Sequence, residues 1–293
     1  MALGYAIEIE DLWFRYPLSE DWVLRGVNIN IREGEFVAIM GPSGCGKSTL
    51  LYILAGIIPN MIKGEIKGSV RVLGREILNL RPEDIVRNVG FVFQNPDSQL
   101  LMPTVLEEVI MGLENLGLPR EEILARAWDV IRYVGLEGKA RQSPRSLSAG
   151  EKQILAIASV LALKPRILIL DEPTSMLDHI GTARVLGLIE KLKKEARITV
   201  IVVEHRIEWA VEVADKIAIM NNGRIEAFGD PREVFGDPDL VRRTGIRPPM
   251  ISEVFYRLAE EGLEIHRIPI TVNEGIDDIK RILGDHLGYT NRG

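Results

Sequence analysis

Gly41-Pro42-Ser43-Gly44-Cys45-Gly46-Lys47-Ser48-Thr49 is the stretch that decides the fold of this chain. It matches the phosphate-binding pattern G-x-x-x-x-G-K-[ST] at every fixed position. Its glycines let the backbone curl so that successive N–H groups point at one anion. The amine of Lys47 can then reach the β- and γ-phosphates of a nucleotide, and the hydroxyl of Ser48 can ligate Mg²⁺. The stretch therefore predicts a nucleotide-binding loop.

The residues on either side of this loop support the same interpretation. Residues 36–40 form a short, wholly apolar run, which is typical of a buried parallel strand. Residues 49–56 have the pattern of a helix that ends at a glycine. A helix that begins after a strand and a glycine loop adds its dipole to an anion site. Pattern and flanks agree, and we therefore prefer this interpretation to a chance Gly/Ser turn.

Composition limits the class of protein. The chain has 293 residues, which suits one large domain, or one domain with a small appendage. Hydrophobic residues make up 46% and charged residues 27%, as in ordinary soluble globular proteins. The net charge of −6, without a block of Lys and Arg, argues against nucleic acid as the main partner. The longest apolar run, residues 154–163, is too short to span a bilayer.

The single cysteine and the first residues indicate a cytoplasmic location. One cysteine cannot form an internal disulfide, so a reducing compartment is expected. The N-terminus lacks the basic start and apolar core of a signal peptide. Cys45 itself lies inside the loop, and we interpret it as a small filler rather than a nucleophile, because no base is fixed beside it.

Apolar and polar residues alternate over much of residues 5–40 and 64–93, which predicts strands with one solvated face. The stretch Trp13-Phe14-Arg15-Tyr16-Pro17 lies among them. An aromatic residue upstream of a phosphate loop could stack on an adenine ring, or all of these aromatics could belong to the core. Alternation places Phe14 and Tyr16 on one face, and the proline places Tyr16 at a strand end. We therefore choose Tyr16 as the candidate adenine contact.

Three more apolar runs each end in residues that suit phosphate chemistry. They end at Gln94, at Asp171-Glu172 and at Glu204-His205. The carboxyl ends of strands in an α/β sheet are where such folds present ligand contacts. Neighbouring residues of a strand point oppositely, so one acid can hold Mg²⁺ while the other contacts water. Gln94 could touch Mg²⁺ or a water, or it could be an ordinary loop amide.

The remaining segments alternate between helix and hairpin patterns. Residues 96–158 are predicted to be mostly helical. Within them, Ser146 to Gln153 precedes an apolar helix and is either an N-cap or a second anion site. Residues 216–228 predict a hairpin around Asn221-Asn222-Gly223. Beyond residue 236 we predict two amphipathic helices, whose apolar faces carry Val254, Phe255 and Leu258, and Ile276, Ile279 and Leu283. We expect the first face to be buried against the core or a partner.

Together these motifs resemble the ATP-binding cassette ATPase family over about residues 5–235. The resemblance implies an α/β fold with a P-loop NTPase core, a RecA-like parallel sheet. It also implies an antiparallel β subdomain and an α-helical signature subdomain beside that core. The domain division that follows is an ATPase domain over residues 1–235, with the helical subdomain inserted at about 96–158. Residues 236–293 then form a small α-rich C-terminal extension.

The resemblance also implies a role for each candidate site residue. The cofactors are ATP and Mg²⁺, with Mg²⁺ held by Ser48, Gln94 and Asp171. The catalytic residues are Glu172 as the base that polarises water, His205 as the switch that holds the γ-phosphate, Lys47, and Gln94, which couples nucleotide state to the partner. The nucleotide is further bound by Tyr16 and by residues 41–49. Ser148 and Gly150 approach it from a second subunit, and Ser175-Met176-Leu177-Asp178 crosses the interface between the two.

The signature sequence departs from the family pattern. Leu-Ser-Gly-Gly-Gln is represented here by Leu147-Ser148-Ala149-Gly150-Glu151. Ser148 and Gly150, which are expected to touch a γ-phosphate, are kept. Ala149 adds a methyl group, whose effect we expect to be mild. Glu151 places a negative charge near a phosphate site, so we expect Glu151→Gln to tighten ATP-dependent dimerisation. Glu204-His205-Arg206 likewise differs from the common Thr-His-Asp, although the histidine is kept.

Within the family, residues 94–100, residues 112–119 and the C-terminal extension look most like the ATPase subunits of energy-coupling factor importers. That resemblance implies a motor subunit for uptake of a vitamin or a transition-metal ion. The implied partners are a second cassette ATPase (this chain or a paralogue), a transmembrane coupling protein and a substrate-binding membrane protein. The implied location is the cytoplasmic, inner face of the cell membrane.

Two other functions compete with this one. A soluble cassette ATPase that acts on nucleic acid or ribosomes tends to carry two cassettes, a coiled-coil insertion or zinc-type cysteines, and this sequence shows none of them. A regulatory module that binds nucleotide without turnover is opposed by the presence of Lys47, Asp171, Glu172 and His205.

Overall fold

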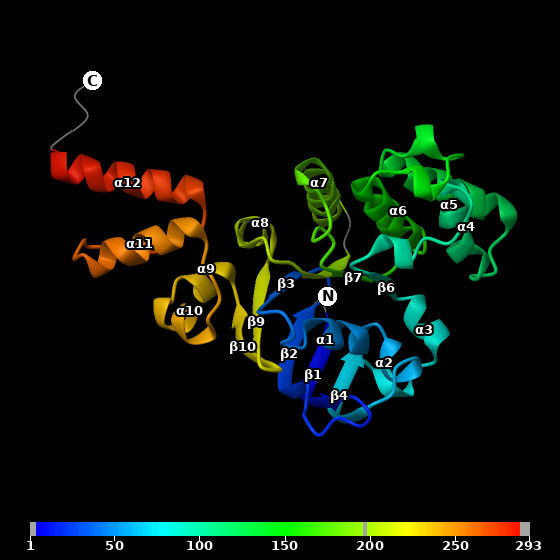
Figure 1. Cartoon of the computed structure of the whole chain (residues 1–293), viewed down its shortest axis with the longest axis horizontal. Coiled ribbons are helices and arrows are strands. Elements are labelled where there is room, and N and C mark those ends of the chain that lie inside the picture. The colour runs from blue at the N-terminus through cyan, green and yellow to red at the C-terminus, as the bar shows by residue number, and fades with distance from the viewer. Residues whose placement is uncertain (1–3, 196–197, 288–293) are drawn as a thin grey trace.

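Two sheets form the centre of the molecule (Figure 1), in a computed structural model that describes residues 4–195 and 198–287. The first has six strands in the order β10-β9-β3-β8-β7-β6, and the second has four in the order β2-β1-β4-β5. The six-stranded sheet consists of β3 (Phe36–Met40), β6 (Val89–Val92), β7 (Ile167–Asp171), β8 (Thr199–Val203), β9 (Lys216–Asn221) and β10 (Arg224–Gly229). The four-stranded sheet consists of β1 (Tyr5–Arg15), β2 (Leu24–Arg32), β4 (Glu65–Val72) and β5 (Arg75–Glu76).

The pairing of these strands confirms the predicted α/β fold. From β9 to β6 every neighbouring pair in the large sheet is parallel, and only the hairpin strand β10 pairs antiparallel. The smaller sheet is antiparallel throughout. The result is a P-loop NTPase core with a separate antiparallel β subdomain.

The large sheet is buried on both faces, which explains its uninterrupted apolar strands. In β3 the side chains of Phe36, Ala38 and Met40 enter one hydrophobic core, and those of Val37 and Ile39 enter the other. The first core is shared with the helices above the sheet, and the second with α1 and the antiparallel sheet below it (Figure 1). Because the sheet is packed on both sides, its polar chemistry is confined to the strand ends.

Helices occupy three regions. Near the phosphate loop lie α1 (Lys47–Leu54), α2 (Ile57–Asn60) and α3 (Pro82–Val86). The predicted helical segment contains α4 (Val105–Glu114), α5 (Arg120–Tyr133) and α6 (Ala149–Leu161), with short 3-10 turns at Pro96–Ser98, Glu137–Lys139 and Pro144–Ser146. The rest of the core carries the 3-10 turn Ile77–Asn79, α7 (His179–Glu195), α8 (Ile207–Val213) and α9 (Pro231–Phe235). The extension contributes α10 (Pro238–Thr244), α11 (Met250–Glu260) and α12 (Val272–Leu287).

The C-terminal extension lies at the opposite end of the molecule from α4–α6 (Figure 1). The Tyr256 hydroxyl donates a 2.5 Å hydrogen bond to the carbonyl of Phe235, and Arg232 on α9 pairs with Glu274 on α12. Phe255 is fully buried, whereas its predicted companion Val254 is 43% exposed. The apolar face predicted for α11 is therefore only partly buried.

The predicted second amphipathic helix is present as α12, and two of the isoleucines of its apolar face are exposed. Ile276 is 45% exposed and Ile279 is 37% exposed, and the side chain of Leu283 lies outside the described residues. The helix instead packs through Gly275, where an added Cβ would lie 2.3 Å from a side-chain carbon of Ile251. A glycine lets two helices approach closely, and a count of apolar positions does not register it.

None of the helices in the two described ranges is both long enough and apolar enough to cross a membrane.

Candidate nucleotide-binding site

The candidate residues meet because four adjacent strands end at one edge of the large sheet. In the order β3-β8-β7-β6, the strands lead into the phosphate loop, Glu204-His205, Asp171-Glu172 and Phe93-Gln94. All four strands are parallel, so their carboxyl ends lie on the same side. Segments more than a hundred residues apart in sequence are thus brought to one place.

Two positions of the phosphate loop have a backbone and surroundings that favour glycine. Gly41 has φ +151°, and a Cβ there would lie 2.0 Å from the carbonyl oxygen of Met220. Gly46 has φ +107° and immediately precedes α1, whose first turn holds no acidic residue. The positive end of the helix dipole therefore faces the loop without a competing carboxylate.

Lys47 is buried and folded back over the loop. Its Nζ donates to the carbonyl of Gly41 at 2.8 Å and to that of Pro42 at 2.9 Å. These bonds satisfy a buried ammonium group, which would otherwise be costly. A nucleotide phosphate in the loop would replace neutral carbonyls with a charged acceptor.

A cavity of about 360 Å³ opens beside the loop. Its lining is Tyr16, Val23, Ser43, Gly44, Gly46, Lys47, Ser48, Thr49 and Glu172. Tyr16 is held there by a 3.0 Å hydrogen bond between its hydroxyl and Thr49 Oγ1, and by edge contact with Phe14. Val23 was not anticipated, since a single valine before a strand carries no sequence signal. Cys45, a residue of the loop itself, is buried, and burial raises the pKa of its thiol, which suits a filler.

Ser48 and Asp171 provide oxygen ligands that fit Mg²⁺. Ser48 Oγ donates to Asp171 Oδ1 at 3.2 Å, so the two oxygens lie side by side. Asp171 is buried, and loss of hydration raises its pKa, while the Ser48 hydrogen bond and the charge of Lys47 oppose that rise. Within residues 4–195 and 198–287, no group of three His, Cys, Asp or Glu side chains is placed to hold a metal alone. Mg²⁺ characteristically combines one or two protein oxygens with phosphates and water, which matches this pair.

Glu172 is the centre of a second cluster. His205 Nε2 lies 3.0 Å from Glu172 Oε1, and Gln94 Nε2 donates to Glu172 Oε2 at 3.0 Å. Gln94 also donates to Ser175 Oγ at 3.1 Å. Gln94 thus contacts the second acid directly, whereas Ser48 contacts the first. Glu172 has the left-handed backbone (φ 45°), a costly conformation for a residue with a side chain.

In the signature segment, Glu151 has partners within the chain that its sequence does not indicate. Ser148 is the N-cap of α6, and Glu151 completes a capping box with it. The Glu151 carboxylate accepts from Lys139 Nζ at 2.7 and 2.8 Å, and Arg184 lies 3.7 Å away. Hydrogen bonding to Lys139 lowers the pKa of Glu151. Within the chain Glu151 is therefore a charge paired with two basic side chains, not an isolated one.

Gly150 and Ala149 also have structural explanations. A Cβ at Gly150 would lie 2.7 Å from the Cα of Gly181 on α7, so glycine permits the contact of α6 with α7. The Ala149 side chain is exposed. Neither Ser148 nor Gly150 lines the cavity beside the phosphate loop. Within one chain these two halves of the expected site remain separate.

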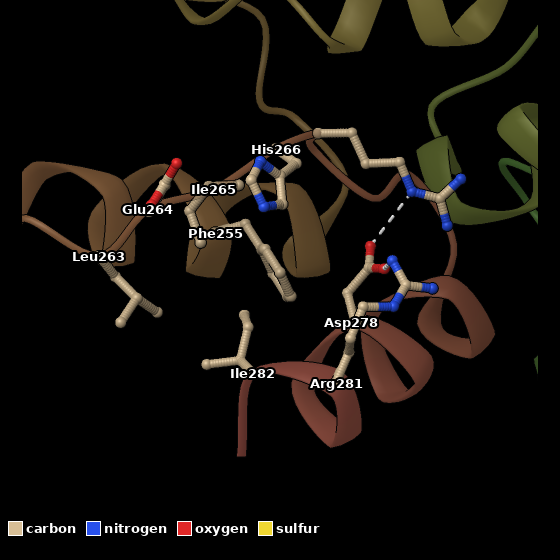
Figure 2. A pocket seen from close by; sticks show the side chains of 9 residues that line it. Phe255, Leu263, Glu264, Ile265, His266, Asp278, Arg281 and Ile282 are labelled. Carbon is tan, nitrogen blue, oxygen red and sulfur yellow. Dashed lines mark hydrogen bonds and ion pairs between the residues drawn. The ribbon is translucent and has the colours of Figure 1, made fainter. Parts of the chain in front are cut away.

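Another cavity, of about 210 Å³, lies in the C-terminal extension (Figure 2). Phe255, Leu263 and Ile282 form its apolar walls, and Asp278 pairs with Arg267 at one end. It shares no lining residue with the cavity at the phosphate loop. It is therefore not part of the nucleotide site.

Residues 24–175 match the sequence model of the family described as ABC transporter. A protein of Pyrococcus horikoshii described as an ABC transporter ATP-binding protein is 46% identical over 274 residues, covering 94% of this chain and 96% of that protein. A protein of Methanosarcina mazei with the same description is 40% identical over 277 residues, covering 94% and 83% of the two chains.

Two solved structures are similar over most of the chain. CbiO1 of Clostridium perfringens, described as part of the ABC transporter complex cbiONQ, has a TM-score of 0.73 and 34% identity, covering 86% of this chain and 99% of that one. The ATP-binding cassette MJ0796, a dimer bound to ADP and phosphate, has a TM-score of 0.66 and 32% identity, covering 76% and 98%.

Proposed function

Because this chain belongs to the ABC transporter family, as a nucleotide-binding subunit that hydrolyses ATP for transport, we propose that it drives an importer of the energy-coupling factor type. The observation that carries the proposal is the similarity to CbiO1, which spans 86% of this chain and nearly all of that protein. That match extends beyond residues 24–175, the part of the chain that the family model covers. The cargo would then be a vitamin or a transition-metal ion.

Nucleotide binding would use the groups that line the loop cavity. Lys47 Nζ and the loop amides bind the β- and γ-phosphates, and Tyr16 stacks on the adenine. Ser48 and Asp171 would hold Mg²⁺, which neutralises phosphate charge when bound. Burial raises the pKa of the Asp171 carboxyl, and the hydrogen bond from Ser48 and the positive charge of Lys47 oppose that rise.

Hydrolysis would depend on Glu172. Its carboxylate accepts a proton from a water molecule as the water oxygen attacks the γ-phosphorus, and the bond to the β-phosphate oxygen breaks to release ADP and phosphate. His205 Nε2 and Gln94 Nε2, each 3.0 Å from a different oxygen of Glu172, orient that carboxylate. The contact from Gln94 also links the base to the loop after β6, so a partner that moves this loop would disturb the base.

A second cassette would complete the site. One chain leaves Ser148 and Gly150 outside its own loop cavity, and the similar cassette MJ0796 is a dimer with ADP and phosphate. In a head-to-tail pair, Ser148 and Gly150 of one copy approach the γ-phosphate in the other, and Asp178 lies near the crossing. Exclusion of water from that interface strengthens each charge contact inside it. The second cassette is a copy of this chain or a paralogue.

We also propose a division of labour along the chain. Residues 1–235 form the ATPase domain, with the helical subdomain of about 96–158 inserted for contact with the membrane partners, and residues 236–293 form an extension. The subunit would sit at the inner face of the cell membrane, beside a transmembrane coupling protein and a substrate-binding membrane protein.

Identification of the natural partners tests this proposal. The tagged full-length chain is purified from detergent-solubilised membranes of its own cells, and the co-purifying proteins are identified by mass spectrometry, with a tagged unrelated cassette as the control. We expect one coupling protein and one small substrate-binding membrane protein, absent from the control. Recovery with conventional permeases and a soluble binding protein would contradict the importer type. Recovery with ribosomes or nucleic acid would favour the soluble ATPase alternative.

A further inference from the structure

Glu204 is a buried carboxylate at the carboxyl end of β8, only 4% exposed. Its Oε1 accepts the backbone N–H of His205 at 2.9 Å and that of Arg206 at 3.2 Å. Its Oε2 accepts the hydroxyl of Thr174 at 2.7 Å. Thr174 is itself buried and lies two residues after Glu172. One side chain therefore joins the segment that carries the histidine to the segment that carries the proposed base.

A carboxylate is suited to this position because of its geometry. It has two oxygens with about four acceptor sites, whereas a threonine hydroxyl at the same place has one oxygen. The three donors come from two different segments of the chain. Each oxygen of Glu204 accepts hydrogen bonds from only one of these segments. A buried carboxylate without such donors would be strongly unfavourable. The hydrogen bonds thus both permit the buried charge and fix the two segments relative to each other.

The relative position of these segments determines the Glu172–His205 contact. That contact is a single 3.0 Å interaction, and the His205 side chain is otherwise half exposed. Glu172 also keeps a left-handed backbone conformation that must be held by its surroundings. The bond from Thr174 to Glu204 is a buried contact immediately beside it that can hold the chain in place.

We propose that Glu204 is a positioning residue for ATP hydrolysis, which holds Glu172 and His205 in register through Thr174 and through the amides of His205 and Arg206. The proposal rests on the roles proposed above for Glu172 and His205. Glu204 touches neither nucleotide nor water in this scheme; it acts only through the geometry of the other two side chains. Its loss should therefore lower the rate of the chemical step more than the affinity for ATP.

The test compares variants of the full-length chain in its purified complex. Glu204→Gln keeps the size of the side chain but turns an NH₂ group toward donors. Thr174→Val removes the hydroxyl, and Thr174→Ser restores it. Glu208→Gln is the matched control, because it makes the same chemical change at an exposed site on α8. For each variant we would measure kcat, KM for ATP, binding of a fluorescent ATP analogue and Tm.

We expect Glu204→Gln and Thr174→Val each to lower kcat by about 10- to 100-fold, the range for small misplacement of catalytic groups. KM and analogue binding should change by less than about twofold, because ground-state binding is not affected. Thr174→Ser should keep most of the activity, and the Glu204→Gln/Thr174→Val double variant should lose little more than either single variant.

Several outcomes would overturn the proposal. Glu204→Gln could behave like Glu208→Gln, or kcat, ATP binding and Tm could all fall together, as in a general loss of folding. If Glu204→Gln does not fold, the comparison of Thr174→Val with Thr174→Ser decides, and equal activities would overturn the proposal. Glu172→Gln in the same panel separates the role proposed for Glu172 from the role proposed for Glu204. If Glu172→Gln keeps turnover, Glu172 is not the base, whatever the Glu204 variant shows.

Discussion

Replacement of Glu151 by Gln removes one charge and leaves the helix cap in place. Glu151 is the third helical residue of the capping box of α6, a position where Gln serves as well as Glu. The charge that is lost is paired with Lys139, at 2.7 and 2.8 Å from its two oxygens. The Glu151 side chain is 14% exposed and that of Lys139 is 38% exposed. The variant therefore measures the contribution of the ion pair without disturbing the helix cap.

The expected effect is modest because water screens Lys139. Exposed ion pairs contribute about 0.2–1 kcal/mol, and hydrogen bonds to charged groups about 1.5–3 kcal/mol when well shielded. This pair lies between those cases, and the exposure of Lys139 moves it toward the lower one. We expect Glu151→Gln to lower the free energy of unfolding by about 1 kcal/mol at pH 7, or Tm by about 1.5–2 °C for a protein of this size.

The pH dependence of this stability difference shows whether the charge of Glu151 causes it. Lys139 holds the pKa of Glu151 below its ordinary value, so the unfolded chain binds this proton more readily than the folded one. The stabilising contribution is present above the ordinary glutamate pKa of about 4.3 and is lost as pH falls through the lowered pKa. The difference in Tm between wild type and variant should therefore be full at pH 7 and should shrink below about pH 4.

Thermal unfolding of full-length wild type and Glu151→Gln, followed by circular dichroism at pH 7 and below about pH 4, measures this difference in Tm. Lys139→Met and the double variant complete a double-mutant cycle that reports the pair alone. A variant as stable as wild type at pH 7, or a variant that dimerises more tightly with ATP, would refute the structural explanation. The second result is what the sequence by itself led us to expect.

Three other substitutions follow from single contacts. Tyr256→Phe removes the hydrogen bond to Phe235 and should destabilise the extension by about 1–2 kcal/mol, seen as faster limited proteolysis after residue 245; unchanged cleavage would count against this contact. Gly150→Ala places a methyl group 2.7 Å from the Gly181 Cα, so ATP binding should persist while turnover falls by about tenfold or more; equal loss of both would contradict a role at the interface. Asp171→Asn should raise the Mg²⁺ concentration for half-maximal ATPase activity by about tenfold or more, and an unchanged Mg²⁺ titration would remove it from the metal site.

Local patterns explain why much of the fold could be predicted. The phosphate loop is specified by glycines whose special backbone is needed there, as at Gly41. The buried strands are continuous apolar runs because both faces of the sheet are covered. Each of these runs leads directly into a polar residue, and parallel pairing then brings Gln94, Asp171 and His205 to one edge.

The parts that could not be predicted depend on contacts between elements. The partner of Glu151 is Lys139, in a separate turn, so its charge is neutralised by tertiary structure that no sequence pattern records. The packing side of α12 is set by the absence of a side chain at Gly275, and hydrophobic periodicity counts only side chains that are present. The bond from Thr174 to Glu204 joins two strand ends and likewise has no sequence signal.

The central claim is that ATP is hydrolysed between two cassettes, with Glu172 as the base. Sedimentation of the full-length Glu172→Gln protein, together with whichever cassette co-purifies with it, tests this most directly when run with and without Mg²⁺-ATP. We predict a monomer without nucleotide and a stable dimer with ATP, in a protein whose turnover is lower by about 10²–10⁴-fold. A protein that stays monomeric in both states, and whose wild-type form has a specific activity independent of protein concentration, would contradict the composite site.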